Sequence, residues 1–121
     1  MGTRPLVLVG FSQGGMLALD HVLHAVKQPT ALVLLSSSRI AWPQWQPLLS
    51  RLAGLPMLVS HGRTDADLAF SAGEAIRDAA LAGGANVTWL PFDGGHGVPM
   101  IVWRGLRNFL QRLLTPTASQ T

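Results

Sequence analysis

The chain has 121 residues, of which 48% are hydrophobic and 12% charged, so it has the size of one domain and is too apolar for an intrinsically disordered protein. Its apolar runs are far shorter than the about 20 residues of a membrane-spanning helix, which excludes a transmembrane protein. The net charge is only +3 and the nine Lys and Arg side chains are scattered along the chain, which argues against a nucleic acid as partner.

The apolar pattern alternates between short continuous runs and longer segments with helical spacing. Short runs bounded by glycine, proline or serine are typical of buried strands, whereas apolar residues at intervals of three and four predict helices. In chain order we expect a strand at Leu6–Val9, a helix at Gln13–Val26, a strand at Ala31–Leu35, a helix at Trp45–Leu52, a strand at Met57–Ser60, a helix at Phe70–Leu81, a strand at Val87–Phe92 and a helix at Val98–Leu114.

This order predicts an α/β fold in which about four parallel strands alternate with four helices. The strands are continuous apolar runs rather than alternating patterns, which indicates burial on both faces of the sheet. Helices must then cover both faces, which gives a three-layer sandwich. We expect one domain over residues 1–114 and a polar tail over residues 115–121.

Residues 10–14 match the pattern Gly-x-Ser-x-Gly, with Ser12 at its centre. The pattern follows a predicted strand and opens a predicted helix, which is the setting of a nucleophile elbow. In such an elbow the serine occupies a sharp, strained turn. We expect Gly10 and Gly14 to remove side chains that would clash there, and Gly15 to let the helix approach the sheet. A dinucleotide-binding loop would need glycine at position 12, so the sequence favours the elbow.

A serine nucleophile needs a base, and the base needs an acid that orients it. Asp65 follows the third predicted strand and His96 follows the fourth. Because the carboxyl ends of parallel strands meet at one edge of the sheet, both side chains are candidates to meet Ser12 there. Two alternatives stay open, namely Asp67 as the acid and His61 as the base. No cysteine is present, which excludes a thiol nucleophile and a Cys-ligated metal.

Several aromatic and histidine residues have two interpretations. Trp42 and Trp45 either line an acyl pocket or pack in the core, and we expect Trp89 and Trp103 to belong to the core. His21 and His24 lie at helical spacing but have no evident third ligand, so we expect no metal there.

Three segments carry a resemblance to a known family: Leu8–Gly15 (Leu-Val-Gly-Phe-Ser-Gln-Gly-Gly), His61–Asp65 and Phe92–His96. They are similar to the carboxylesterase/phospholipase family of α/β-hydrolases, which includes acyl-protein-thioesterase-like bacterial esterases. The resemblance implies a serine esterase that cleaves carboxylic ester or thioester bonds through an acyl-enzyme and needs no cofactor. It implies that Ser12 is the nucleophile, His96 the base, Asp65 the orienting acid and the Gln13 N–H an oxyanion donor.

The chain departs from the family in two ways. Ala66, Asp67, Leu68 and Ala69 stand where the family usually has a proline-containing segment, which adds a second carboxylate close to Asp65. The resemblance also covers only the C-terminal half of the family's fold, so the loop that gives the second oxyanion N–H is absent. One edge of the strand at residues 6–9 would then be unpaired and apolar, a site for a second copy or for the missing half.

The resemblance therefore implies a small-molecule or lipid ester as substrate. The N-terminus lacks the features of a signal peptide, so we expect a cytoplasmic protein. The alternative from another functional class is a catalytically inactive hydrolase fragment or interaction module that pairs through its open sheet edge. A phosphate-binding α/β domain that uses the glycine-rich turn at a helix N-terminus is a further alternative.

Overall fold

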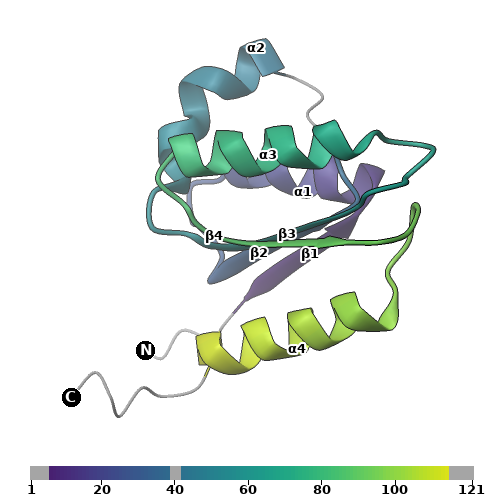
Figure 1. Cartoon of the computed structure of the whole chain (residues 1–121). Coiled ribbons are helices and arrows are strands. Elements are labelled where there is room, and N and C mark those ends of the chain that lie inside the picture. Colours follow the sequence, from purple (N-terminus) through teal and green to yellow (C-terminus); the bar gives the residue numbers. More distant parts are fainter. Residues whose placement is uncertain (1–5, 39–41, 115–121) are drawn as a thin grey trace.

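The computed structural model describes residues 6–38 and 42–114, and its centre is a parallel four-stranded sheet (Figure 1). The strands lie side by side in chain order, and each pairs in parallel with the next. The expected polar tail at 115–121 lies outside the described residues. The strands are β1 (Val7–Phe11), β2 (Ala31–Leu35), β3 (Pro56–Gly62) and β4 (Asn86–Phe92).

Helices cover both faces of the sheet, as the continuous apolar runs predict. Helices α1 and α3 lie on one face with the α2–η1 segment beyond them, and α4 lies alone on the opposite face (Figure 1). The bounds are α1 (Gln13–His24), α2 (Trp42–Trp45), the 3₁₀-helix η1 (Gln46–Leu52), α3 (Phe70–Ala82) and α4 (Met100–Leu114). The expected α/β fold of four parallel strands and four helices is confirmed.

Two helices differ from the sequence prediction in detail. The second is a single α-helical turn that continues as a 3₁₀-helix, with Pro47 near the junction. Proline has no N–H to donate, so it weakens continuous α-helical hydrogen bonding at that point. The last helix begins at Met100 rather than Val98, because Pro99 supplies the carbonyl that accepts the first helical hydrogen bonds, from Val102 and Trp103.

The core has two parts, one on each side of the sheet. Side chains of α1, η1 and α3 pack against one face, and Val102, Leu106 and Phe109 of α4 pack against the other. Every residue of β2 is buried, which explains why its sequence has no polar alternation. No described helix is long and apolar enough to cross a bilayer.

The tryptophans separate into buried and exposed positions. Trp45 is fully buried and its indole N–H donates to Asp20, so it is a core residue and not a pocket residue. The side chain of Trp42 lies outside the described residues. The expectation that Trp103 is in the core is wrong, because it lies about 100° around α4 from the buried Val102 and is 52% exposed.

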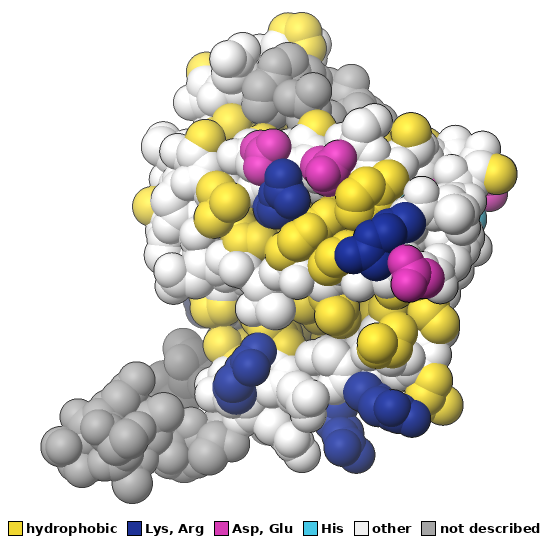
Figure 2. Space-filling model, viewed as in Figure 1, with side chains coloured by type: hydrophobic (Ala, Val, Ile, Leu, Met, Phe, Trp, Pro, Cys, Tyr) yellow, Lys and Arg dark blue, Asp and Glu magenta, His cyan; other side chains and the backbone are white. Residues whose placement is uncertain are grey.

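Charged side chains on the face seen in Figure 2 lie apart from one another rather than in one patch, and acidic side chains accompany some of the basic ones. Arg77 contacts Asp78 at 2.9 Å, and Arg63 contacts Asp93 at 3.0 Å. The basic side chains in the lower part of Figure 2, over α4, have no acidic side chain beside them on this face.

Candidate active site

Ser12 lies at the junction between the end of β1 and the start of α1, in a strained backbone conformation. Its φ is 56° and its ψ is −122°, a region that residues with a side chain rarely adopt. Several hydrogen bonds hold this turn. The Ser12 N–H donates to the Leu35 carbonyl at 2.8 Å, and the Ser12 carbonyl accepts from the Gly15 N–H and from Ser37 Oγ. The sequence motif therefore forms the sharp strand-to-helix turn of a nucleophile elbow.

Two of the three glycines around Ser12 are required by close packing. A Cβ on Gly10 would lie 2.4 Å from the Cα of Gly15, and a Cβ on Gly15 would lie 1.8 Å from Ser37 Oγ. The expectation for Gly14 is wrong, because nothing lies within 4 Å of the position its Cβ would take. Gly14 faces open space, so only Gly10 and Gly15 hold helix α1 close to the sheet.

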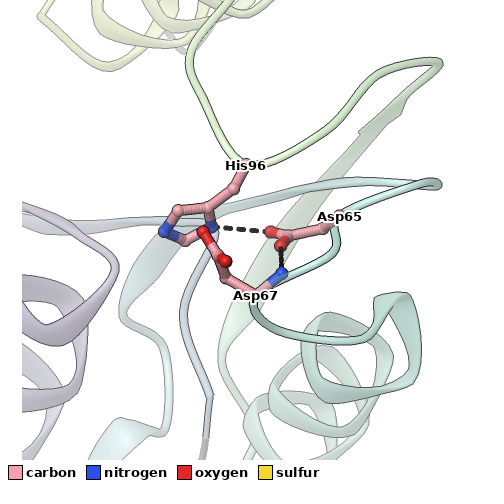
Figure 3. A group of neighbouring side chains, drawn as sticks. All are labelled: Asp65, Asp67 and His96. Atoms are coloured by element: carbon pink, nitrogen blue, oxygen red, sulfur yellow. Dashed lines mark hydrogen bonds and ion pairs between the residues drawn. The ribbon is translucent and has the colours of Figure 1, made fainter.

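The structure brings Ser12 together with His96 and Asp65, which come from the loops after β4 and β3. His96 Nε2 lies 3.0 Å from Ser12 Oγ, and His96 Nδ1 lies 2.7 Å from Asp65 Oδ2. The second contact is drawn in Figure 3. In a neutral imidazole one nitrogen donates and the other accepts, so an N–H on Nδ1 that donates to Asp65 leaves Nε2 free to accept the serine proton.

The Asp65 carboxylate is buried and fully hydrogen-bonded. Its Oδ1 accepts from the backbone N–H groups of Asp67 and Leu68, each at 2.8 Å, and its Oδ2 accepts from His96. Burial alone would raise the pKa of Asp65, but the Leu68 N–H, His96 and the Asp67 N–H together hold that pKa below its ordinary value. The carboxyl is therefore ionised at neutral pH, the state that fixes an imidazole tautomer.

The rival acid and base occupy other positions. Asp67 is exposed beside His96 and contacts Asp65 through its backbone N–H, whereas the carboxylate hydrogen-bonded to His96 is that of Asp65. His61 is fully buried behind Asp65, with Nε2 2.8 Å from the Leu68 carbonyl and 3.4 Å from Asp65 Oδ2. These two contacts hold the loop from Asp65 to Leu68, and the histidine that contacts Ser12 is His96.

A pocket of about 460 Å³ lies over the serine. Sequence reasoning missed three of its lining side chains: Phe11, Met16 and Leu68. The Phe11 ring centroid lies 4.9 Å from that of His96. Position 11 adjoins Ser12 in the motif, which is the signal that could have identified it. The lining consists of Phe11, Ser12, Gln13, Gly14, Met16, Asp67, Leu68 and His96.

Among the described residues, one group of three ionisable side chains has metal-ligand spacing: Asp65, Asp67 and His96, whose ligand atoms lie within 4.8 Å of one another. Both oxygens of Asp65 and both ring nitrogens of His96 already have protein partners. Asp65 and His96 are therefore already engaged by hydrogen bonds within the chain.

Comparison with known sequences identifies one family. The sequence profile of the Phospholipase/Carboxylesterase family matches residues 2–114, which is nearly the whole chain. No curated protein sequence matches the chain.

Solved structures with the same fold include esterases and thioesterases. SOBER1 of Arabidopsis thaliana is 27% identical with a TM-score of 0.80, over 94% of this chain and 56% of that protein. Acyl-protein thioesterase 2 of Zea mays is 21% identical with a TM-score of 0.81, over 95% and 58%. The Bacillus cereus carboxylesterase is 20% identical with a TM-score of 0.76, over 89% and 50%. This chain therefore spans about half the length of the structures that it matches.

Proposed function

The chain belongs to the phospholipase/carboxylesterase family of α/β hydrolases, and from that premise we propose that it hydrolyses carboxylic esters or thioesters by covalent serine catalysis. The observation that carries this proposal is the continuous hydrogen-bonded chain from Ser12 Oγ through His96 to the ionised Asp65. Such a chain activates a hydroxyl that is otherwise a weak nucleophile.

In the acylation half-reaction, Ser12 Oγ attacks the ester carbonyl while His96 Nε2 takes the hydroxyl proton. Asp65 stabilises the resulting imidazolium and keeps its orientation. The tetrahedral intermediate then collapses, its bond to the leaving oxygen or sulfur breaks, and His96 donates its proton to that leaving group. The product of this half-reaction is an acyl-Ser12 ester and a free alcohol or thiol.

Water completes the cycle by the same steps in reverse roles. His96 takes a proton from water as it attacks the acyl-serine, and it returns that proton to Ser12 Oγ when the carboxylic acid leaves. The Gln13 N–H, at the first position of α1, is the proposed donor to the oxyanion in both half-reactions. One such donor typically contributes about 10²–10³-fold to kcat.

The acyl side of the substrate is proposed to contact the apolar part of the pocket. Phe11, Met16 and Leu68 line the pocket beside Ser12 with apolar side chains. Apolar side chains suit the acyl part of a small-molecule or lipid ester. No metal or organic cofactor has a step in this mechanism.

The open edge of β1 favours a second function, that of an interaction module. Within the described residues β1 pairs only with β2, and Leu6, Val9 and Phe11 are between 41% and 58% exposed. We propose that this edge accepts a further strand from the half of the family's fold that this chain does not span. If the interaction function is correct, the isolated chain is inactive. The complementing polypeptide then adds strands next to β1 and supplies the remaining oxyanion donor.

Hydrolysis assays distinguish the two functions. We expect purified chain to hydrolyse p-nitrophenyl acetate or butyrate, or an acyl thioester, and Ser12→Ala to reduce kcat to background. Ser50→Ala, an exposed serine of η1, is the matched control and should leave kcat unchanged. If the folded parent hydrolyses no ester, the chain alone is not an enzyme and the interaction function is favoured.

A further inference from the structure

Asp67 occupies a position in the pocket that the proposed mechanism does not use. Its side chain is exposed and lies beside the His96 ring, with a carboxylate oxygen within 4.8 Å of a ring nitrogen (Figure 3). Asp67 and His96 are the ionisable residues among the eight that line the pocket, and Asp67 is the acidic one. A substrate held at Ser12 therefore meets this carboxylate.

The backbone fixes Asp67 independently of its side chain. Its N–H donates to Asp65 Oδ1 at 2.8 Å, which makes the residue part of the turn that holds the catalytic acid. The main chain of Asp67 is thus fixed by this hydrogen bond, whereas its carboxylate points toward His96 (Figure 3). A change of the side chain alone leaves the supporting N–H in position.

Within the part of the chain that the structure describes, no basic side chain in the pocket lining cancels the charge of Asp67. Among the described residues that line the pocket, none is a lysine or an arginine. Arg63, two residues before Asp65, forms an ion pair with Asp93 at 3.0 Å. Asp65 adds a second, buried negative charge behind His96, and with a neutral imidazole the site carries a negative potential.

We propose that Asp67 makes this site selective for the charge of its substrate, so that esters or thioesters with a cationic group near the scissile bond are preferred and anionic ones are disfavoured. The inference rests on the proposed hydrolase function. Two unit charges about 6 Å apart at an exposed, water-rich site interact weakly enough that about a three- to tenfold change in kcat/KM is expected for each class.

Three acetyl thioesters that differ in the charge of the leaving thiol test the inference: acetylthiocholine (cationic), S-acetyl-mercaptoethanol (neutral) and S-acetyl-mercaptopropionate (anionic). Free thiol is measured for the parent, Asp67→Asn and Asp67→Glu. We expect Asp67→Asn to lower the cationic-to-neutral ratio of kcat/KM and to raise the anionic-to-neutral ratio, each about three- to tenfold. Asp67→Glu keeps the charge and should keep both ratios. Because intrinsic thioester reactivity is the same for every variant, these shifts report the protein alone.

Two controls define the outcomes. Asp78→Asn makes the same change of net charge on α3, outside the pocket, and should leave the ratios unchanged. About 0.5 M NaCl should reduce the selectivity of the parent. Equal ratios in the parent and Asp67→Asn overturn this inference while hydrolysis of the neutral thioester still supports the proposed function. No Ser12-dependent turnover of any of the three thioesters overturns both.

Discussion

The two edges of the sheet are built differently, although both are edges of one parallel sheet. On β4, Pro91 removes a backbone donor, the Arg77 guanidinium lies 4.9 Å over the Trp89 ring, and α4 packs on the strand. On β1, the sequence Val-Leu-Val-Gly-Phe has no charge and no proline, and Val9 is 52% exposed. Natural sheet edges are usually protected as β4 is, so β1, which pairs only with β2 among the described strands, has the composition of an interior strand.

This difference divides the candidate site. Asp65 and His96 follow β3 and β4, which pair over seven residues next to the protected edge. Ser12 follows β1, which pairs with β2 alone in the described chain. The hydrogen-bonded pair Asp65–His96 is therefore supported by β3 and β4, whereas the turn at Ser12 depends on the edge strand β1 and on the contacts of Gly10, Gly15 and Ser37.

The largest effect on kcat is expected at Asp65, in the loop after β3. Asp65→Asn keeps the shape of the acid but removes the charge that orients His96, so we expect kcat to fall by about 10⁴-fold. Asp67→Asn should change kcat for a neutral ester by less than about threefold, because its backbone N–H and not its carboxylate supports Asp65. Ester hydrolysis by the two variants makes the comparison, and equal losses would show that Asp67 shares the role of the acid.

The second prediction concerns the stability of the serine turn. Gly10→Ala places a Cβ 2.4 Å from the Gly15 backbone, and we expect it to lower the free energy of unfolding by about 2–4 kcal/mol. Gly14→Ala, four residues further along the motif, has open space and a helical site, so it should be neutral or stabilise by up to about 1 kcal/mol. Urea denaturation measures both, and similar values for the two variants would contradict the packing described around Gly15.

Much of this architecture could be predicted from the sequence, and the reasons lie in particular segments. Ala31–Leu35 is a run of five buried apolar residues, which alone indicates a strand covered on both faces. The sequence also predicted that the loops with Ser12, Asp65 and His96 meet at one sheet edge, because parallel strands end together. Their catalytic roles remain the proposal made above.

Other features depend on three-dimensional contacts that a linear pattern does not contain. The exposure of Trp103 depends on which side of α4 lies over the sheet. The burial of His61 behind Asp65 depends on the path of the loop that ends at Leu68. The role of Gly14 could not be separated from that of Gly10, since both are glycines of one motif and only packing distinguishes them.

A smaller effect is expected at the open edge itself. We expect isolated chain to self-associate through β1, and Val9→Lys to weaken this association at least about tenfold, because a charge on an edge strand opposes pairing. Thr88→Lys makes the same change on the half-buried β4 edge and should have little effect. Sedimentation analysis over a range of concentrations measures this, and a parent that stays monomeric would contradict the description of β1 as an unsatisfied edge.

The smallest expected effect is the pH dependence contributed by Asp65. Because its folded-state pKa lies below the ordinary value of 3.8, its ionised form stabilises the folded chain at every pH above that value. This stabilisation is lost as the pH falls below 3.8 toward the lowered pKa. The difference in Tm between the parent and Asp65→Asn should therefore shrink as the pH falls below about 3.8. A difference that grows in acid would contradict the lowered pKa.

The most direct test of the central claim is the intact mass of the chain after reaction with a fluorophosphonate, which phosphonylates only a serine activated by its neighbours. We predict one adduct on the folded parent and none on Ser12→Ala. This result would mean that Ser12, after β1, acts together with Asp65 and His96, after β3 and β4, in this chain. A folded parent that gains no adduct, or an equal adduct on Ser12→Ala, would contradict the assignment of Ser12 as an activated nucleophile.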